Sequence, residues 1–286
     1  MFSNPKRNKK QATCKDAWFD YYAGFSAAFV RTAIEQLIPD LDGTVVDPWN
    51  GSGTTTTTAH EIGVCSTGID INPVMLVVAR AKLLTPGVME SLLPIAEDIV
   101  ARSRTTSCEL RLNEPLQEWF STAGARGIRR LEQAIRQLLT PLTPSDMLSV
   151  PDSLDAVSDL AAFFLVALFK TVRSFLGRFQ ASNPTWIKSP ETKQKRIRPT
   201  EEKTAELFLR NVAAMIKGIV PVARDTTTSI LLGSSEQLPV CSSSVQAVIS
   251  SPPYCTRIDY AIATKPELAV LGCPLHTELE ALRRRM

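Results

Sequence analysis

GTVVDPWNGSGTTTTTAHEIGVCSTGID (residues 43–70) is the stretch that decides the fold. It contains two short apolar segments, 43–47 and 63–70, which have the composition of buried strands and each end on an acid. A helix is predicted between them over 54–62, and Pro73, favoured at the first position of a helix, predicts another after the second strand. Alternating strands and helices predict an α/β domain built on a parallel sheet.

The loop after the first strand is rich in turn residues and begins with an acid, Asp47. In a parallel sheet, ligands bind where strands end, because a glycine turn lets the backbone approach the ligand beside a helix N-terminus. The loop lacks the Lys-Ser/Thr ending of a nucleoside triphosphate loop. Asp70 follows close to the offset of about 20 residues at which an acid on the second strand binds ribose hydroxyls. The pattern predicts a nucleoside ligand; the alternative is an ordinary tight turn with Asp70 as a helix cap.

The remaining chain divides into helical and strand segments. Residues 17–38 carry a helical stripe of Phe25, Phe29, Ala33 and Leu37, which predicts one helix. Helical periodicity then dominates up to about residue 224, with breaks rich in Pro and Ser. Strand character returns near the C-terminus, so a helical insertion is predicted to divide the α/β domain.

The bulk composition is that of a soluble globular protein, with 286 residues, 44% apolar content and a net charge of +3. The apolar run 160–169 is much shorter than the ~20 residues of a membrane span, so it predicts a buried helix and no membrane segment. No secretory signal follows the basic N-terminus, and six cysteines without a CxxC pair favour a reduced compartment. With two histidines, no metal site is predicted. We expect a cytoplasmic protein.

A second motif, Ser251-Pro252-Pro253-Tyr254, follows an apolar strand predicted at 245–250. Two prolines end the hydrogen-bonded ladder and fix an extended backbone that offers only acceptors. The Ser251 hydroxyl and the proline carbonyls can accept hydrogen bonds from an exocyclic amino group, while Tyr254 offers a flat face to a base. The alternative is a proline turn that ends a strand.

Together, DPWNGSG, GIDINP and SPPY resemble the amino-group DNA methyltransferases, which use S-adenosylmethionine to methylate cytosine N4 or adenine N6. In that family, a glycine-rich cofactor motif and an Asp/Asn/Ser-Pro-Pro-aromatic catalytic motif follow two neighbouring strands of a Rossmann-like sheet. SPP is more typical of the cytosine-N4 members. The resemblance therefore implies cytosine-N4 methylation of DNA in a restriction-modification or defence system; adenine-N6 and RNA base methylation are the alternatives. A cytosine-C5 enzyme would need a nucleophilic cysteine where this chain has Tyr254.

Carried over residue by residue, the resemblance implies a catalytic set and a cofactor set. The catalytic residues are Ser251, Pro252, Pro253 and Tyr254. The cofactor-binding residues are Asp47, Pro48, Trp49, Asn50, Gly51, Ser52, Gly53, Thr54, Asp70, Ser234, Tyr22 and Phe25. Ser234 stands where the family usually has an acid, so it brings no charge to the adenine. Phe25 is equally expected as a core residue.

The implied reaction needs no covalent intermediate. Hydrogen bonds from the amino group to Ser251 and to the Pro252 carbonyl would favour a pyramidal nitrogen, whose lone pair then points in line at the methyl sulfonium. The base must first leave the duplex, and it would stack on Tyr254.

DNA contacts are predicted in the stretch 182–199, which holds five basic residues against one acid, Glu191. The tentative DNA-binding residues are Trp186, Lys188, Lys193, Lys195, Arg196 and Arg198. The alternative is a solvated loop.

The predicted organisation is a flexible basic arm (1–16), a cofactor-binding half (17–85), a helical insertion (86–226) and a catalytic half (227–286). In the family the sheet has seven strands. Its order across the sheet begins with strands 3-2-1-4, and three more strands lie beyond strand four. The residues after SPPY supply only a helical segment, so strand four would be left as an open edge. We expect a truncated reading frame; a second chain that completes the sheet, or cover by the helical insertion, are the alternatives. An inactive DNA-binding module is the non-enzymatic alternative.

Overall fold

The structure is a computed structural model that describes residues 3–6, 13–20, 24–140, 157–181, 186–252 and 259–285. Its centre is a parallel four-stranded sheet in the order β3-β2-β1-β4. The strands are β1 (Thr44–Asp47), β2 (Cys65–Asp70), β3 (Thr228–Leu232) and β4 (Ala247–Val248). The α/β fold with a parallel sheet is confirmed, and the strand order is the one that the resemblance implies for the first four strands.

Two helices connect the first strands, α2 (Thr54–Ile62) and α3 (Pro73–Ala81). Glycines in the left-handed conformation flank α2: Gly53 with φ 81° precedes it and Gly63 with φ 77° follows it. Because this conformation is costly for a residue with a Cβ atom, the two glycines determine where the helix begins and ends. Asn72 caps α3 with its side chain.

The N-terminal helix differs from the prediction. A 3-10 helix, η2, spans Cys14–Trp18 and α1 spans Ala27–Leu37, so a single helix over 17–38 is wrong. Gly24, with φ 141°, interrupts the helical conformation, and Ser26 caps α1. The buried face of α1 consists of Val30, Ala33 and Ile34, whereas Leu37 is exposed. The predicted stripe is therefore rotated relative to the observed one.

A flexible arm was expected over residues 1–16, but Lys15 in η2 is fixed in place. Its side chain is buried, and its Nζ donates a hydrogen bond of 2.6 Å to the carbonyl of Lys82 at the end of α3. An ion pair of 3.4 Å with Glu61 offsets the cost of burying the charge. Burial lowers the pKa of Lys15, and Glu61 opposes that shift. This contact attaches η2 to the α/β part of the molecule.

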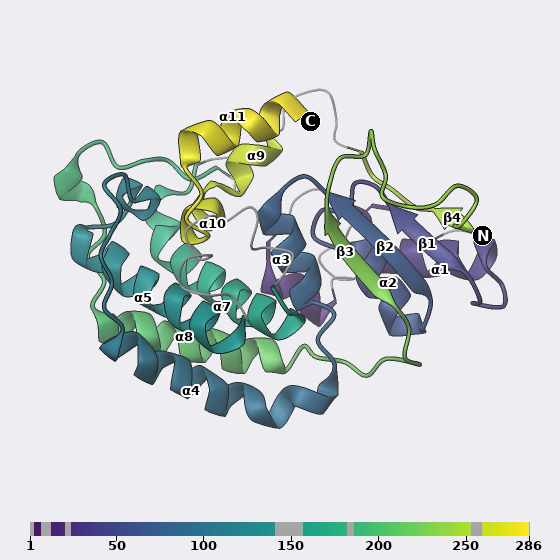
Figure 1. The fold of residues 1–286 in the computed structure, drawn as a ribbon, viewed down its shortest axis with the longest axis horizontal. Helices are drawn as coiled ribbons and strands as arrows, with labels where there is room; N and C mark the ends of the chain where they lie inside the picture. The colour runs from purple at the N-terminus through teal and green to yellow at the C-terminus, as the bar shows by residue number, and fades with distance from the viewer. Residues whose placement is uncertain are drawn as a thin grey trace.

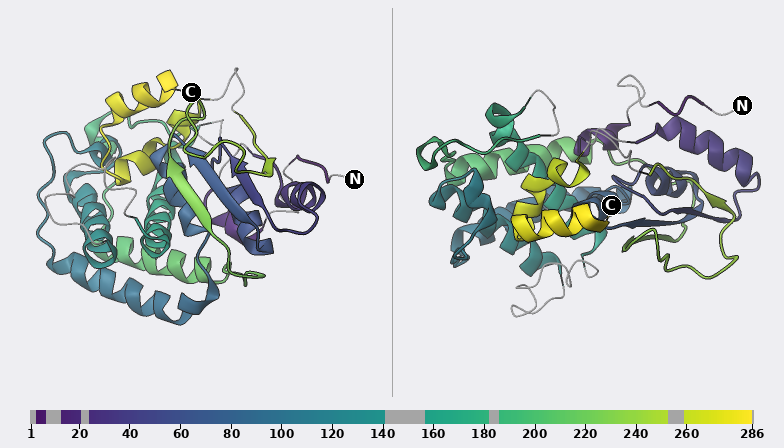
Figure 2. Two further views of the ribbon diagram at one scale, coloured as in Figure 1. Left: turned by 45° about the vertical axis from the view of Figure 1, so that its right-hand side comes forward. Right: turned by 90° about the horizontal axis from the view of Figure 1, so that it is seen from above.

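Helices fill the described chain between α3 and β3. They are α4 (Met89–Thr105), α5 (Thr122–Leu139), α7 (Asp159–Leu176) and α8 (Glu201–Ile216), with 3-10 turns η3 (Pro86–Val88), η4 (Pro115–Glu118), η7 (Gly177–Phe179) and η8 (Lys193–Lys195). Figures 1 and 2 show these helices, here called the helical region, at one end of the molecule and the sheet at the other. The segment Asp159–Phe179 is long and apolar enough to cross a membrane, but most of it lies inside the molecule. The apolar run is a core helix, as predicted.

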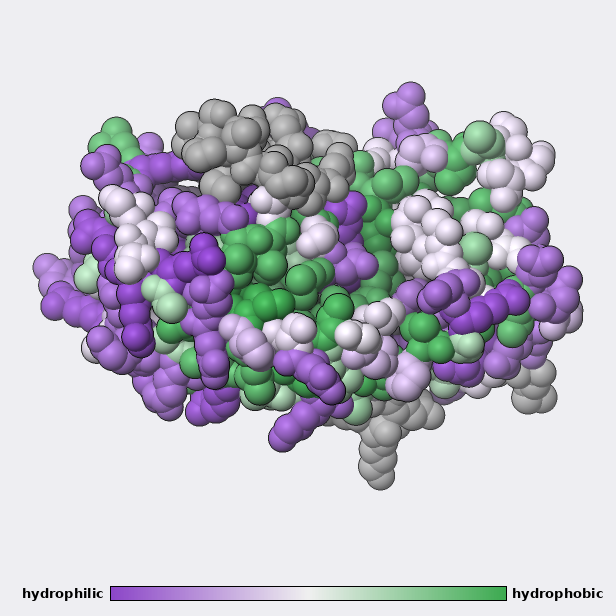
Figure 3. All heavy atoms as spheres, turned by 60° about the horizontal axis from the view of Figure 1, so that its bottom comes forward, coloured by the Kyte–Doolittle hydropathy of each residue, from purple (hydrophilic) through white to green (hydrophobic). Residues whose placement is uncertain are grey.

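Two hydrophobic clusters cover the two faces of the sheet. The smaller one joins α1 and α2 to β1 and to the strand end at Ile249. The larger one joins α3 to the helical region, and Phe163 and Phe164 of α7 lie fully buried within it. On the face drawn in Figure 3, hydrophobic side chains gather in the middle and hydrophilic ones lie on both flanks. The core therefore runs from the sheet into the helical region.

Three short helices follow the SPPY motif: α9 (Tyr260–Ala263), α10 (Lys265–Val270) and α11 (Leu275–Arg285). Figure 1 shows them in yellow, above the helical region and away from β4. Helix α10 contacts α7, η4, α5 and α3, while α11 packs against α9 and α10, and none of the three continues the sheet. Val248 on β4 is 59% exposed. Among the described residues, the helical region does not cover this edge of the sheet, which contradicts one of the explanations for an open edge.

Candidate active site

The glycine loop and the second acid lie at the same edge of the sheet. Strands β1 and β2 are parallel neighbours with Asp47 opposite Gly68, so Asp47 and Asp70 both lie at carboxyl ends. The amide of Asn50 donates to the carbonyl of Ile69 at 3.0 Å, and the amide of Gly51 donates to Oδ2 of Asp70 at 2.8 Å. The loop after β1 is therefore bonded to the end of β2, as a ligand site at this edge requires.

The Asp47 side chain is buried, with 2% of the residue exposed, and its carboxylate accepts several hydrogen bonds. Its Oδ2 accepts from the Thr55 hydroxyl at 2.6 Å, and its Oδ1 accepts from the amide of Trp49 at 3.0 Å. The Ser250 hydroxyl also donates to Oδ1, at 2.9 Å. Burial raises the pKa of Asp47 to about 6, although these three hydrogen bonds favour the carboxylate.

Asp70 is held by backbone amides. In addition to Gly51, the amide of Asn72 donates to its Oδ1 at 2.8 Å. Burial raises the pKa of Asp70 to about 6 against these bonds, and the nearby charge of Asp47 contributes to the rise. An ionised carboxylate has about four acceptor sites, so the bonds from Gly51, Asn72 and Ile71 still leave capacity for a ligand hydroxyl. Asp70 is thus bonded both to the loop, through Gly51, and to the start of α3, through Asn72.

Two glycines at this edge of the sheet, Gly53 in the loop and Gly68 on β2, have no space for a Cβ atom. A Cβ atom on Gly53 would lie 2.8 Å from the Cβ of Ala79, and one on Gly68 would meet the side chain of Asn50 at 2.4 Å. The Nδ2 of Asn50 is buried without a hydrogen-bond partner. Because buried polar groups normally have partners, a polar ligand at the loop fits this donor. The acid, the glycines and the free amide together fit a nucleoside cofactor.

The second motif begins at the same place. The amide of Ile249 donates to the carbonyl of Val46 at 3.1 Å, and Ser250 reaches Asp47, which lies 203 positions earlier. Ser251 and Pro252 follow and are exposed. The structure therefore brings the start of SPPY to the glycine loop. Pro253 and Tyr254, like Tyr22 of the cofactor set, lie outside the described residues.

Two other predicted cofactor residues, Ser234 and Phe25, lie in different parts of the structure. Ser234 follows β3, whose Leu232 pairs with Asp70, so it lies near the acid; its hydroxyl accepts from the amide of Glu236 at 3.2 Å. Phe25 is partly buried, and its ring centroid lies 5.6 Å from that of Phe29, against the smaller hydrophobic cluster. That packing is the core role expected as the alternative for Phe25.

The predicted DNA-binding stretch is attached to the helical region. The Trp119 indole donates to the carbonyl of Lys188 at 3.2 Å, and the amide of Ser121 donates to the carbonyl of Ile197 at 2.8 Å. Lys265 of α10 lies over the Trp119 ring, 5.5 Å from its centroid, so the stretch lies near α10. Most of its predicted contacts are exposed, and Arg196 is partly buried; the exposed ones are Trp186, Lys188, Lys193, Lys195 and Arg198. Lys195 pairs with Glu191.

Sequence reasoning missed several residues that build the site. Thr55 and Thr56 belong to a threonine run with poor helix propensity, yet Thr55 binds Asp47 and the Thr56 hydroxyl donates to Oδ1 of Asn50 at 3.1 Å. Asn72 caps α3 and also donates from Nδ2 to the hydroxyl of Thr264 at 2.9 Å. Hydroxyls directly after a glycine loop were the available signal. Nothing in the sequence indicated Thr264.

Comparison with known proteins finds similarity to DNA methyltransferases. A family model described as DNA methylase, for N6 and N4 methyltransferases, matches residues 2–80. The Type II methyltransferase M.BsoBI of Geobacillus stearothermophilus is 25% identical over 89% of this chain and 52% of its own length. The Type II methyltransferase M.ScaI of Streptomyces caespitosus is 41% identical over 61 residues, which cover 21% of this chain and 20% of its own. No solved structure matches.

The match to M.BsoBI has the greater weight because it runs through both motifs and the helical region, whereas the family model covers only the glycine loop and the second acid. The chain spans about half the length of M.BsoBI. Methyltransferases of this kind use S-adenosylmethionine, a nucleoside cofactor, which agrees with the ligand deduced from Asp70 and the loop. Over residues 2–80 the chain is similar to the N6/N4 family of DNA methylases, and it is similar to two Type II methyltransferases.

Proposed function

We propose that the protein transfers a methyl group from S-adenosylmethionine to the exocyclic amino group of cytosine (N4) in DNA. The contact between Ser250 and Asp47 is the main support, because it brings the start of SPPY against the proposed cofactor loop. The names of the two Type II methyltransferases support the reaction class, and the SPP motif supports cytosine. We place the enzyme in the cytoplasm, within a restriction-modification or defence system.

The cofactor site in this proposal is the edge formed by β1 and β2. Bound S-adenosylmethionine would supply an electrophilic methyl group. The Asp70 carboxylate accepts hydrogen bonds from the ribose hydroxyls, the glycines allow close approach, and Ser234 bonds the adenine. Asp47 acts mainly by fixing the loop, since its oxygens already serve Thr55, Trp49 and Ser250. The remaining proposed contacts are Pro48, Trp49, Asn50, Ser52, Thr54 and Tyr22, whereas Phe25 packs against Phe29 in the core.

The catalytic step depends on orientation of the target nitrogen. Ser251 and the Pro252 carbonyl accept hydrogen bonds from the amino group, so that the nitrogen lone pair points at the methyl group. Tyr254 stacks on the flipped base. Proton release to solvent is available because Ser251 and Pro252 are exposed. Lysines and arginines of the stretch 186–199 contact the DNA backbone.

Adenine N6 is the second candidate target, because the matched family model covers N6 and N4 enzymes alike. The chemistry at Ser251 and Pro252 is the same for either amino group. Mass spectrometry of nucleosides from cells that express the protein, or a longer form of it, distinguishes the two. We expect N4-methylcytosine; N6-methyladenine would replace cytosine with adenine in the proposal.

Two variants separate cofactor binding from transfer. Asp70→Ala should lose S-adenosylmethionine binding in calorimetry, whereas Ser251→Ala should bind the cofactor and lose methyl transfer to DNA. Lys203→Ala, a control on the exposed face of α8, should match the wild type. If wild type and Asp70→Ala both bind no cofactor, the result would support the non-enzymatic alternative. Transfer to RNA but not DNA would support the RNA alternative.

A further inference from the structure

The segment of α9 and α10, residues 259–272, is held in place by side chains from outside it. It is the first described part of the chain after Pro252 of the SPPY motif. Nearly all of α10 is buried, including Glu267, which is 1% exposed. None of its residues pairs with a described strand. Its position is determined by apolar packing in the larger hydrophobic cluster and by polar contacts with the helical region and with the end of β2.

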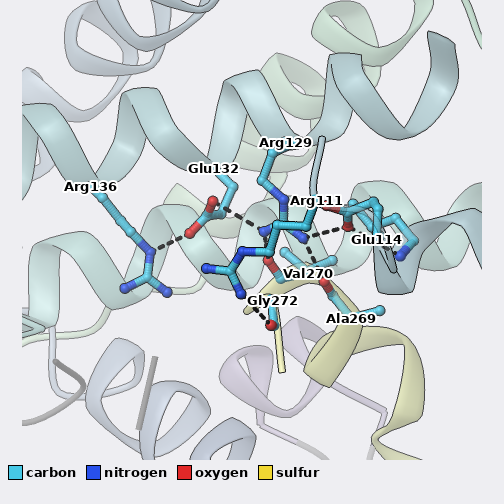
Figure 4. Close-up of polar contacts among 9 residues, drawn as sticks. Arg111, Glu114, Arg129, Glu132, Arg136, Ala269, Val270 and Gly272 are labelled. Carbon is cyan, nitrogen blue, oxygen red and sulfur yellow. Dashed lines mark hydrogen bonds and ion pairs between the residues drawn. The ribbon is translucent and has the colours of Figure 1, made fainter. Parts of the chain in front are cut away.

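Arg129 of α5 caps the C-terminal end of α10. Its Nη1 donates to the carbonyl of Val270 at 2.6 Å and its Nη2 to the carbonyl of Ala269 at 2.9 Å. Figure 4 shows Arg129 reaching both carbonyls, with Arg111 directed at the carbonyl of Gly272, 3.3 Å away. The last carbonyls of a helix lack partners within the helix and carry partial negative charge, so a guanidinium there is favourable.

Acidic side chains hold Arg129 in this orientation. Its Nη2 is 2.7 Å from Oε1 of Glu114, and its Nη1 is 3.2 Å from Oε2 of Glu132, which also pairs with Arg136. All four side chains of this network, shown in Figure 4, are at least nine-tenths buried. Burial disfavours the charge of Arg129, but Glu132 and Glu114 outweigh it and raise its pKa. The guanidinium is charged and aimed at α10 at every physiological pH.

Arg173 of α7 holds the start of the same segment. It forms a bidentate ion pair with Glu267, with its Nε 2.5 Å from Oε1 and its Nη2 2.8 Å from Oε2. The Nη2 also donates to the carbonyl of Ala263, the last residue of α9, at 2.5 Å. One arginine therefore joins α9 to α10, and bidentate geometry fixes direction as well as distance.

A third contact connects the segment to the proposed cofactor site. Asn72 follows the acid Asp70 by two residues, and its Nδ2 donates to the Thr264 hydroxyl between α9 and α10. Thr264 is 1% exposed. The segment is thus anchored at α5, at α7 and at the end of β2.

A buried ion network is a poor source of stability, because well-packed apolar side chains often serve equally well. Such a network does constrain geometry. We propose that Arg129 and Arg173 are positioning residues for methyl transfer, which fix the α9–α10 segment that follows the SPPY motif in the chain and contacts the end of β2 through Asn72. This inference rests on the proposed function, and it gives the helical region a role apart from DNA contact.

The test compares Arg129→Met and Arg173→Met with a matched control, Arg130→Met. Arg130 is the next residue on α5 and forms an ion pair with Glu201, away from α9 and α10. Methionine keeps the length and apolar stem of the side chain. Amide hydrogen exchange is measured for peptides within 244–252 and 259–272, together with S-adenosylmethionine affinity and the single-turnover rate on DNA.

We expect both test variants to exchange faster in the two peptides while the β1 and β2 peptides and the cofactor affinity stay unchanged. The single-turnover rate per cofactor-binding site should fall about tenfold or more, since misplacement of about 1 Å can cost a hundredfold. A purely structural role would lower the active fraction and leave the rate per site unchanged. Arg173→Lys, which keeps one charge but cannot serve both Glu267 and Ala263, should give an intermediate rate.

Unchanged exchange in both peptides, or a wild-type rate per site in both methionine variants, would overturn the inference. If Arg129→Met does not fold, Arg173→Met and Arg173→Lys decide the question, because Arg173 is partly exposed. Failure of the proposed function gives a different result: the wild type would then bind no cofactor or transfer no methyl group. In that case the exchange comparison still determines whether the arginines hold the segment.

Discussion

Asp47 is buried and Asp70 is partly buried, and the two neighbouring carboxyl groups have different partners. The oxygens of Asp47 accept hydrogen bonds from Trp49, Thr55 and Ser250, whereas Asp70 accepts from backbone amides and keeps acceptor capacity for a ligand. Burial raises both pKa values to about 6. At neutral pH the site therefore holds two carboxylates near each other, which suits a positively charged cofactor.

Cofactor affinity should depend on pH through Asp70. Protonation removes an acceptor for ribose hydroxyls, so the affinity for S-adenosylmethionine should fall about tenfold between pH 7 and pH 5, as expected for a pKa of about 6. Calorimetry across this range gives the measurement. In Asp70→Asn the affinity should be weaker at pH 7 and nearly independent of pH. An unchanged pH profile in that variant would mean that another group titrates.

The stability of the ligand-free protein should change in the opposite direction. The folded state binds the Asp70 proton more tightly than the unfolded chain, so this contribution is fully present below pH 4 and is lost as pH rises through 6. The free energy of unfolding of the wild type, minus that of Asp70→Asn, should therefore rise by about 2–3 kcal/mol from pH 7 to pH 4. Urea denaturation of both proteins provides the comparison; a falling difference would contradict the raised pKa.

At the scale of elements, the loop between β1 and α2 depends on backbone conformation. Gly53 has φ 81° and no space for a Cβ atom beside Ala79. Gly53→Ala should lower the free energy of unfolding by about 2–4 kcal/mol, because strain and overpacking combine. It should also weaken cofactor binding, since the loop must shift. Gly177→Ala, where the added methyl meets nothing within 4 Å, is the control. Equal stability of the two variants would refute the constraint.

The basic stretch next to η4 should act electrostatically. Lys188, Lys193 and Arg198 are exposed, and charge neutralisation at DNA phosphates releases counterions. Replacing each with Ala should weaken binding to any DNA sequence and reduce the slope of log affinity against log salt by about 1. Fluorescence anisotropy at several salt concentrations measures this slope. Lys203→Ala, an exposed lysine paired with Glu206, controls for the loss of charge alone. Identical slopes would leave the stretch as a solvated loop.

At the scale of the whole molecule, one core connects the sheet to the helices. The larger cluster contains α3 from the α/β part and α4, α5, α7, α8 and α10 from the remainder. The two parts should therefore unfold together, with far-ultraviolet circular dichroism and tryptophan fluorescence giving coincident urea transitions. Phe164→Ala should lower the free energy of unfolding by about 3–5 kcal/mol without separating the transitions. Leu112→Ala, at a 96% exposed position, should have little effect. Two separate transitions would contradict a shared core.

Prediction from sequence succeeded where the signal was local. Local signals marked the element bounds: glycines flank α2, acids end the first two strands, and a proline begins α3. The four strands of the sheet were predicted from the same kind of short apolar pattern. The single helix over 17–38 failed because apolar periodicity continued through Gly24, where the backbone conformation ends helical geometry. The role of the threonine run in the site was not predicted, because Thr55 contributes through its hydrogen bond to Asp47, which the loop brings beside it.

The sequence by itself determined the β-α-β-α order, the glycine loop and the two acids, because each depends on the conformation of neighbouring residues. Only the tertiary structure decided that Ser250 meets Asp47, that Asn72 reaches Thr264, and that Arg129 and Arg173 hold the segment after SPPY. These contacts join residues 90 to 203 positions apart. No local pattern encodes such a pair, because the contact exists only when the sheet order and the packing of α7 against α3 have brought the partners together.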